Sequence, residues 1–435
     1  MEAKKIKKGI HPNYHKELAN SEEIEDFGQP EEVLIPVGQH IGAPAKPIVD
    51  VGDKVKVGQK IAEKAGFISA NIHSSIAGEV IEVCETGDGQ AIRIKNDGSN
   101  QSAKLGSGKD YTELSVEELV ELVEEAGIVG LGGATFPTNV KMSIPEEKNV
   151  ETIILNGAEC EPYLTIDHRM MVEKAEDVVY GLKAIMKMTD ANQAYIGIEL
   201  NKPDAIAKME EVVADESNIE ITPLEVMYPQ GGEKQMIQAI LDKEVPSGGL
   251  PLDIGIVVNN IGTALAIKEV IKDGKSLYQR GVTVTGQAIE KPGNYIVPIG
   301  TPIRELIEKA GGFSEEPGKV VQGGPMTGKA EKDLDSPVLK GTSGIIALPK
   351  DKVSDYEAGP CIRCAKCIDH CPANLMPTTL SGFAQEKMAV ELDDYNVLDC
   401  IECGCCTYIC PAKIELLDWI KLGKQQVTAM KRENE

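Results

Sequence analysis

The sequence predicts a multidomain protein in which β-rich domains flank a central α/β domain and a cysteine-rich domain comes last. Three observations predict this order. Glycine and proline interrupt short runs of valine and isoleucine between residues 33 and 83. Apolar strands alternate with helical segments between residues 152 and 273. Two runs of cysteines then lie between residues 361 and 410, and 435 residues suffice for about three domains.

Composition and charge exclude several classes of protein. The net charge of −24 repels a phosphate backbone and aromatic content is only 4%, so nucleic acid is not an expected partner. No apolar run approaches the roughly 20 residues that cross a bilayer, and the N-terminus lacks the apolar core of a signal peptide. We therefore expect no transmembrane span. Abundant cysteine available for metal indicates a reducing compartment, the cytosol.

Residues 1–30 predict an extended arm, because they are polar and show no hydrophobic period. Residues 31–105 predict a barrel-sandwich hybrid domain: the segments VGDKVKVGQ and SSIAGEV resemble the flattened barrel of biotinyl and lipoyl carrier domains. Those carriers present a modifiable lysine on a hairpin, whereas residues 66–70 here read Gly-Phe-Ile-Ser-Ala. The barrel is therefore expected to be structural or a docking surface, not a swinging arm. Residues 97–110 predict a linker.

Residues 110–273 predict an α/β domain. A helix is expected from Ser115, whose capping-box partner is Glu118, to Gly127. Buried parallel strands are expected at 152–155 and 253–258. Between them we expect helices near 170–188 and 203–214 and strands near 194–199 and 219–227. Alternating strands and helices favour a mostly parallel sheet.

Polar side chains follow the strands of this expected sheet. Asn156 follows the first strand, and Asn259 and Asn260 follow the last. Tyr228 follows another strand and adds an aromatic face. Parallel sheets bind ligands beyond the carboxyl ends of their strands, and asparagine amides both donate and accept hydrogen bonds. These positions predict a nucleotide or flavin pocket.

A glycine-rich segment, GLGGATFPTNVK, begins at residue 130. Glycines let backbone N–H groups approach an anion, and Lys141 supplies a counter-charge. The segment does not fit the dinucleotide fingerprint G-x-G-x-x-G and follows a helix instead of a strand, so a plain glycine turn is the alternative. The polar strand ends nearby favour the anion-binding interpretation.

The two cysteine runs both fit the spacing C-x2-C-x2-C-x3-C-P, which holds a [4Fe–4S] cluster. In such pairs the cysteine before proline ligates the other cluster. The spacing therefore predicts one cluster on Cys361, Cys364, Cys367 and Cys410, and a second on Cys400, Cys403, Cys406 and Cys371. Zinc or disulfides are the alternatives, but zinc sites use two C-x-x-C arms. The C-P frame favours Cys406 over Cys405, and Cys160 is expected to be a buried thiol.

The last segments complete the predicted organisation. Residues 274–350 are strand-rich with one helix near 303–310. The two-cluster ferredoxin-like α domain is expected at 354–415, after a short polar linker. An amphipathic C-terminal helix is expected over 416–435, packed on the cluster domain or on a partner subunit.

Four motifs resemble, in order, the motif blocks of the NADH-binding flavoprotein subunit of respiratory NADH dehydrogenases. They are GLGGATFPTNVK, NGAECEP, YPQGGEK and VVNNIGTALA. That family binds FMN in an α/β domain and stacks nicotinamide on it. With the barrel in front and the cysteine runs behind, residues 9–425 resemble the RnfC component of the Rnf ion-translocating ferredoxin:NAD oxidoreductase complex. The resemblance implies that residues 274–350 form a β-grasp domain like the soluble-ligand-binding domain of these families.

The resemblance also implies site residues. Gly132, Gly133 and Ala134 would lie along the flavin, Lys141 would neutralise its phosphate, Asn156 and Glu159 would contact it, Tyr228, Asn259 and Asn260 would close the pocket, and Phe136 and Glu161 would face NADH. Gly231 and Glu233 belong to the same cofactor-binding set. Two positions depart from the family pattern: Leu131 replaces an arginine, and Gly232 replaces the first of two glutamates.

The expected function is the NAD(H)-site subunit of a membrane-associated complex that passes electrons between NAD(H), FMN and two [4Fe–4S] clusters. Hydride transfer to a flavin needs no protein nucleophile. The resemblance implies membrane and ferredoxin-like partner subunits and a peripheral position on the cytoplasmic face of the bacterial membrane. The alternatives are a soluble flavin and iron–sulfur reductase, such as a cobalamin reductase, and a non-catalytic relay subunit or scaffold. The sequence does not identify the pumped ion.

Overall fold

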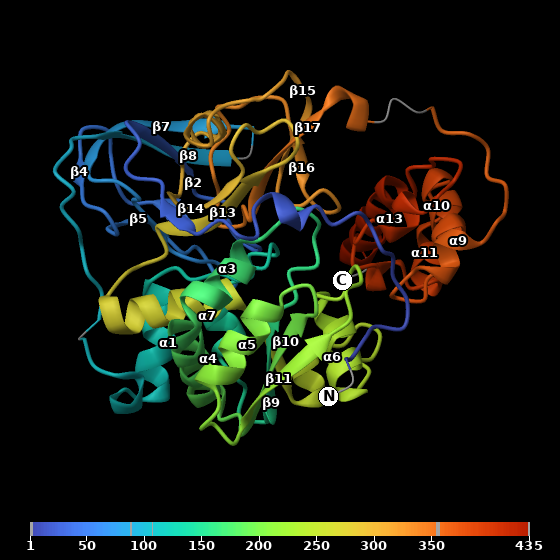
Figure 1. The fold of residues 1–435 in the computed structure, drawn as a ribbon, viewed down its shortest axis with the longest axis horizontal. Coiled ribbons are helices and arrows are strands. Elements are labelled where there is room, and N and C mark those ends of the chain that lie inside the picture. Colours follow the sequence, from blue (N-terminus) through green and yellow to red (C-terminus); the bar gives the residue numbers. More distant parts are fainter. Residues whose placement is uncertain (1–2, 88, 107, 354–356, 434–435) are drawn as a thin grey trace.

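The computed structural model describes residues 3–87, 89–106, 108–353 and 357–433. Two β domains lie side by side above an α/β domain, and a small helical domain stands at one side (Figure 1). The N-terminal segment runs between the α/β domain and the helical domain. Three predicted bounds fall outside the described residues. They are residue 1 for the N-terminal arm, residue 354 for the start of the two-cluster domain and residue 435 for the end of the C-terminal helix. No helix among the described residues is long and apolar enough to cross a membrane.

The first β domain consists of two antiparallel sheets. One has the order β2 (Glu32–Pro36), β8 (Gly89–Asn96), β7 (Gly78–Thr86), β4 (Lys54–Val55), and the other β3 (Lys46–Pro47), β5 (Lys60–Glu63), β6 (Ile72–His73). Alternate side chains, among them Val33 and Ile35, point inward and are fully buried. The strands are antiparallel and apolar on one face, as the barrel prediction requires.

The α/β domain contains one parallel sheet of four strands in the order β11-β10-β9-β12. Its elements are α1 (Val116–Glu125), α2 (Thr138–Met142), β9 (Thr152–Gly157), α3 (Ile166–Glu173), α4 (Ala175–Thr189), β10 (Gln193–Glu199), α5 (Pro203–Val212), β11 (Ile219–Leu224), α6 (Glu233–Leu241), β12 (Ile256–Asn260) and α7 (Ile261–Lys268), which continues as a π-helical turn to Asp273. The strand order reverses at β9, because β10 lies on one side of it and β12 on the other. Sheets with such a reversal bind ligands beyond the carboxyl ends of the strands on either side of it, and this position beside β9 and β12 is called the crevice below.

Two local predictions in this domain can be compared with the structure. The capping box of α1 is formed: Glu118 N–H donates to Ser115 Oγ at 3.2 Å, and Ser115 N–H donates to the Glu118 carboxylate at 2.7 Å. The single helix expected near 170–188 is instead two helices, α3 and α4. They separate at Lys174, whose φ of −131° is not helical. The break lets α3 turn towards the third domain while α4 packs on α7 (Figure 1).

The third domain has a six-stranded mixed sheet in the order β1-β14-β13-β17-β15-β16 and one helix, α8 (Ile303–Lys309). The strands are β1 (Ile24–Asp26), β13 (Gln279–Thr285), β14 (Gly293–Pro298), β15 (Pro317–Gln322), β16 (Lys329–Glu331) and β17 (Gly344–Pro349). Strand β1 belongs to the N-terminal arm and pairs in parallel with β14. The arm is therefore extended, as expected, and it also completes a sheet more than 260 residues away in the sequence.

The C-terminal domain packs short helices against one long helix. These are α9 (Lys366–Asp369), α10 (Pro377–Gln385), α11 (Ala389–Asp394), α12 (Cys405–Tyr408) and α13 (Leu416–Glu433). A short 3-10 turn at Val397–Asp399 belongs to this domain. In the rest of the described chain such turns lie at Lys16–Leu18, Tyr111–Glu113, Pro251–Ile254 and Lys350–Lys352. Leu416, Ile420 and Val427 of α13 are buried in the core that α10 and α11 share. The amphipathic C-terminal helix thus packs on its own domain.

Candidate functional site

The cysteines of the C-terminal domain line two cavities. One is lined by Cys361, Cys364, Cys367 and Cys410, and the other by Cys371, Cys400, Cys403 and Cys406. Each cavity thus gathers the three predicted ligand cysteines of one run and the cysteine before proline of the other run, and Cys405 is a fifth cysteine at the second cavity. The fold therefore produces the crossed grouping that the spacing predicts, and the four predicted ligand thiols at each cavity fit a [4Fe–4S] cluster. Ligation itself stays a prediction.

In the described part of the chain, no three histidine, cysteine or carboxylate side chains are placed to hold one metal ion. A cubane carries its four thiolates on four separate irons, so its ligands stand farther apart. Cys405 also lines the second cavity, but its Sγ lies 3.9 Å from the carbonyl oxygen of Tyr228. The choice of Cys406 over Cys405 stays a prediction.

The two cavities differ in their surroundings. Cys361 and Cys364 are exposed, whereas Cys371 and Cys406 are buried. The second cavity also adjoins the α/β domain: the hydroxyl of Tyr228 donates to the carbonyl oxygen of Cys403 at 2.8 Å. An apolar cluster surrounds this contact and consists of Ile10, Cys160, Tyr228 and Cys405, with Met326, Cys403 and Ile409 against it. The set containing Cys403 has no exposed cysteine and is called the internal set, whereas the set containing Cys361 and Cys364 has two and is called the outward-facing set.

The glycine-rich loop forms a turn over residues 131–134 beside the crevice between β9 and β12. Gly133 has φ +106° and open space where a Cβ would be, so its backbone is accessible. A Cβ on Gly132 would lie 3.4 Å from Cβ of Asn260, which places the loop against the end of β12. The backbone of Leu131 donates to Thr263 Oγ1 at 2.9 Å and fixes the loop on α7. Gly132, Gly133 and Ala134 are all exposed.

Two asparagines meet at this crevice, and a third precedes one of them on β12. Asn156 and Asn260 are register partners on neighbouring strands. The Asn156 amide donates to the carbonyl oxygen of Gly231 at 2.8 Å, and the Asn260 amide donates to Asp167 at 2.6 Å. Asn259 is buried, and its Nδ2 has no hydrogen-bond partner among the described residues. An unpaired buried amide costs free energy, so this donor has the capacity to bond an acceptor that is not part of the described chain.

Lys141 and Glu233 form an ion pair, with Lys141 Nζ 2.6 Å from Glu233 Oε1. They come from α2 and α6, which follow the glycine loop and the YPQGG segment respectively. Both side chains are partly exposed. The fold therefore brings these two predicted site residues together at the edge of the site, where the ammonium is accessible to an anion.

The two glutamates of the NGAECEP segment point inward. Glu159 accepts the backbone N–H of Asp167 at 2.7 Å and that of His168 at 3.4 Å, at the start of α3. Glu161 accepts from Met326 N–H at 3.1 Å and from Thr327 Oγ1 at 2.5 Å. Burial raises the pKa of Glu161. The carboxylates thus tie the segment to a helix and to the third domain, and their roles towards flavin and NADH stay predictions.

Phe136 and Gly231 are placed by backbone contacts. The carbonyl oxygen of Phe136 accepts from Gly130 N–H at 2.9 Å, which closes the glycine-rich loop on itself. The backbone N–H of Gly231 lies 3.3 Å from Cys160 Sγ. Burial raises the pKa of the Cys160 thiol to about 12, so this cysteine is a neutral buried group, consistent with the sequence expectation.

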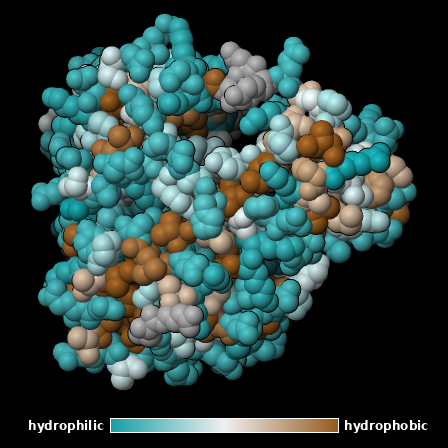
Figure 2. Space-filling model, turned by 45° about the vertical axis from the view of Figure 1, so that its right-hand side comes forward, coloured by the Kyte–Doolittle hydropathy of each residue, from teal (hydrophilic) through white to brown (hydrophobic). Residues whose placement is uncertain are grey.

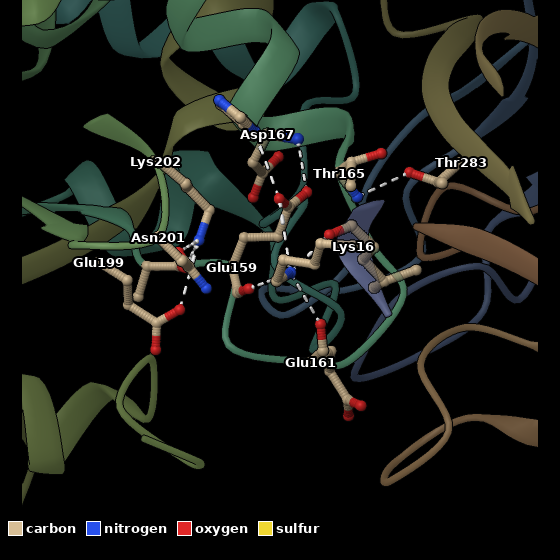
Figure 3. Close-up of polar contacts among 12 residues, drawn as sticks. Lys16, Glu159, Glu161, Thr165, Asp167, Glu199, Asn201, Lys202 and Thr283 are labelled. Carbon is tan, nitrogen blue, oxygen red and sulfur yellow. Dashed lines mark hydrogen bonds and ion pairs between the residues drawn. The ribbon is translucent and has the colours of Figure 1, made fainter. Parts of the chain in front are cut away.

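Two buried lysines were missed by sequence reasoning. Lys16 lies on the N-terminal arm and Lys202 lies before α5, and both ammonium groups point at the loop over residues 158–164 (Figure 3). Lys16 is 6% exposed and Lys202 is not exposed at all. Lysine is seldom buried, and neither position carries a motif, so no signal in the sequence marks them.

Comparisons with known proteins agree with this architecture. Four family models match: the RnfC barrel sandwich hybrid domain over residues 4–99, the Nuo51 FMN-binding domain over 123–269, the SLBB domain over 282–330 and the 4Fe-4S dicluster domain over 353–411. Among curated relatives, the RnfC component of the Na(+)-translocating ferredoxin:NAD(+) oxidoreductase complex of Acetobacterium woodii is 45% identical over 98% of both chains. The corresponding component of the proton-translocating complex of Clostridium ljungdahlii is 44% identical over 89% of this chain and 86% of its own.

The chain belongs to the RnfC family, whose members are subunits of ion-translocating ferredoxin:NAD(+) oxidoreductase complexes. The family resemblance seen in the sequence is thereby confirmed, as is the oxidoreductase class. A relative in Rhodobacter capsulatus, the same component of an ion-translocating oxidoreductase complex, is 40% identical over 86% of this chain and 74% of its own. The matching domain models support FMN and iron–sulfur clusters as the cofactors of this family member.

Solved structures agree on the fold. The NAD+-reducing [NiFe]-hydrogenase in its H2-reduced and air-oxidised states matches with TM-scores of 0.51 and 0.50. Each match covers 72% of this chain and 63% of the other, at 18% identity. At that identity the likeness concerns the fold alone.

Proposed function

We propose that this family member is the NAD(H)-site subunit of a membrane-associated ferredoxin:NAD+ oxidoreductase coupled to ion translocation, and that it holds FMN, NAD(H) and two [4Fe–4S] clusters. The observation that carries the proposal is the contact between Tyr228 and Cys403, which joins the crevice of the α/β domain to the internal cysteine set. FMN, when bound, accepts an electron pair and releases single electrons, which matches a two-electron nicotinamide to one-electron clusters.

The chain's own residues supply binding and orientation. The exposed backbone of Gly133 lets a planar ring approach the loop closely. The Lys141 ammonium neutralises a phosphate, as an alternative to its pairing with Glu233. The buried Asn259 amide donates to an acceptor in the crevice. We propose that Phe136 and Glu161 face NADH. We also propose that the domains have the bounds predicted from the sequence.

The burial of the cysteines supports an order for the clusters. The set containing Cys403 adjoins the α/β domain, so it is the internal relay. The set containing Cys361 and Cys364 is exposed, and Ile362 beside it is 65% exposed. Figure 2 turns this side forward and displays apolar groups on a largely hydrophilic surface. A ferredoxin-like partner subunit would approach here, while membrane subunits hold the chain on the cytoplasmic face.

The pumped ion is not assigned by family membership. Relatives of nearly equal identity, 44% and 45%, are named for protons and for Na+ respectively. The ion-handling residues are expected on the membrane partners.

An anaerobic titration tests the proposed function. Purified protein reconstituted with iron and FMN is titrated with NADH and followed by visible absorbance and EPR. Bleaching of the flavin together with cluster signals supports the proposal. A flavin that NADH does not bleach would point to the non-catalytic relay. Full activity with a soluble acceptor and no association with membrane subunits in the cell would point to the soluble reductase.

A further inference from the structure

The loop over residues 158–164, which follows β9, connects three parts of the molecule. Glu159 caps α3, as its carboxylate accepts two backbone N–H groups there. Cys160 Sγ accepts the N–H of Gly231, in the segment that also carries Tyr228. Glu161 accepts from the third domain at residues 326 and 327. Three consecutive side chains therefore contact three different neighbours, and a shift of the loop would displace all three.

Two lysine ammonium groups hold this loop through its carbonyl oxygens (Figure 3). Lys16 Nζ donates to the carbonyls of Glu159 at 2.7 Å, Glu161 at 3.0 Å and Leu164 at 2.5 Å. Lys202 Nζ donates to the carbonyl of Ala158 at 2.7 Å. Four of the seven carbonyl oxygens in the loop are thus bonded to a buried cation.

The loop backbone needs such support. Glu159 has φ 43° and Tyr163 has φ 69°, both in the left-handed region that side chains other than glycine seldom adopt. A residue in such a conformation is strained and persists only when its surroundings hold it. The three bonds of Lys16 use all three donors of an ammonium. Burial lowers the pKa of Lys16 to about 8, because removal from water disfavours the charged ammonium.

Lys16 reaches the loop from outside the α/β domain. Its arm is fastened along the way: Ile10 and Tyr228 exchange two backbone hydrogen bonds of 2.8 and 2.9 Å, and the carbonyl of Tyr14 accepts from Tyr163 N–H at 2.6 Å. Beyond Lys16, the Asn294 amide donates to the carbonyl of Ala19 at 2.9 Å. The arm therefore crosses from the cysteine domain side to the third domain and delivers Lys16 midway.

We propose that Lys16 is a positioning residue of the flavin and dinucleotide site, acting through the loop that it holds. The inference rests on the proposed function and adds to it a residue outside the four motif blocks. Loss of the ammonium releases the carbonyls of Glu159 and Glu161. The loop then no longer keeps Asn156 and Gly231 in register at the crevice, so FMN and NADH both bind more weakly. The eight predicted ligand cysteines all lie in the C-terminal domain, outside this loop, so we expect iron binding to persist.

The test compares Lys16→Met with Lys16→Arg and with Lys7→Met in the full-length, iron-reconstituted protein. Lys7 lies on the same arm but is exposed, so its substitution makes the same charge change away from the loop. We measure the FMN dissociation constant by fluorescence titration, KM and kcat with NADH and ferricyanide, iron content and thermal unfolding. Lys16→Met is expected to weaken FMN at least tenfold and to raise KM more than it lowers kcat, with iron content unchanged. Lys7→Met matches the wild type, and Lys16→Arg recovers part of the FMN affinity.

Two outcomes overturn the inference. In the first, Lys16→Met binds FMN and NADH as the wild type does. In the second, Lys16→Met loses flavin, iron and cooperative unfolding together and Lys16→Arg recovers none of them, which would make Lys16 a residue of general stability. A wild-type protein that binds FMN but is not reduced by NADH would overturn the proposed function instead, and the FMN titration of the variants would still decide the role of Lys16.

Discussion

The hydroxyl of Tyr228 donates a hydrogen bond of 2.8 Å to the carbonyl oxygen of Cys403. Tyr228 is 2% exposed and belongs to the α/β domain, whereas Cys403 lies in the second cysteine run. A Cβ on the neighbouring Gly404 would be 3.2 Å from the carbonyl oxygen of Met326, so the third domain contacts the same loop. The cysteine loop is therefore docked on two domains at once, which fixes the distance between the crevice and the internal cysteine set.

Substitution of Tyr228 by phenylalanine removes this bond and leaves the half-buried Cys403 carbonyl without this donor. The expected loss is about 1 kcal/mol in the free energy of unfolding, measured by urea titration of the reconstituted protein. Tyr408→Phe is the matched control, because Tyr408 is 48% exposed and close to the same loop. Equal stability of the two variants would contradict a role of the Tyr228 bond in docking. FMN content is expected to stay unchanged in both.

The crossed grouping of cysteines predicts which cluster each serine substitution removes. Cys371→Ser is expected to abolish the internal cluster, and Cys410→Ser the outward-facing one, although each lies in the opposite run. Iron should fall in both from about eight per chain to about four, with distinct EPR signals lost. Cys367→Ser should remove the same signal as Cys410→Ser and leave FMN binding intact.

Cys405→Ser is the control for this series, and it should keep both clusters because Cys405 lies outside the C-P frame. Iron content of about eight per chain in Cys367→Ser would refute the ligand assignment. Loss of the internal signal in Cys405→Ser, with Cys406→Ser intact, would reverse the choice between the two neighbouring thiols.

Removal of Lys141 tests the phosphate contact. Lys141→Ala is expected to weaken FMN binding by a factor of about 10 to 150, because a charge-assisted hydrogen bond is worth about 1.5–3 kcal/mol. Riboflavin, which lacks the phosphate, should bind the variant and the wild type equally. Lys148→Ala is the control, since Lys148 also pairs with a carboxylate, Asp253 at 2.9 Å, and neither residue belongs to the predicted site. Unchanged flavin stoichiometry in Lys141→Ala after gel filtration would exclude the phosphate role.

The parts of the fold that sequence reasoning recovered are those with local causes. The cysteine spacing follows from ligand geometry within a dozen residues, and the structure gathers the two sets as that spacing implies. The α1 capping box depends on two side chains three residues apart. Strand ends marked by Asn156 and Asn260 meet at one crevice because parallel strands share an edge.

The parts that sequence reasoning missed depend on distant contacts. Lys16 lies 143 residues before Glu159, and nothing near it in the sequence distinguishes it from the exposed lysines of the same arm. The pairing of β1 with β14 likewise joins segments about 270 residues apart. Break positions such as Lys174 depend on how α3 and α4 pack, not on helix propensity. Tertiary contacts of this kind override local preference and leave no periodic signal.

Lys340 is a third buried lysine, and it lies where three domains meet. It is 1% exposed, and its Nζ donates to the carbonyl of Asn71 in the barrel at 2.8 Å and to that of Gly127 after α1 at 2.7 Å. Burial lowers the pKa of Lys340 from 10.5 to about 7. A neutral amine can still donate both bonds, so deprotonation keeps the contacts and removes the cost of a buried charge.

This lowered pKa predicts a pH dependence of stability with a definite sign. Between about pH 7 and pH 10 the unfolded chain binds a proton at Lys340 that the folded chain does not, so the free energy of unfolding rises with pH. One such group contributes a slope of at most about 1.4 kcal/mol per pH unit. Lys340→Met should therefore flatten the stability profile in this window relative to the wild type, whatever its absolute stability.

Lys309→Met, on the exposed face of α8, should leave the slope unchanged. Urea titrations of the three proteins at pH 7, 8 and 9 measure the difference, and equal slopes in wild type and Lys340→Met would show that Lys340 keeps an ordinary pKa.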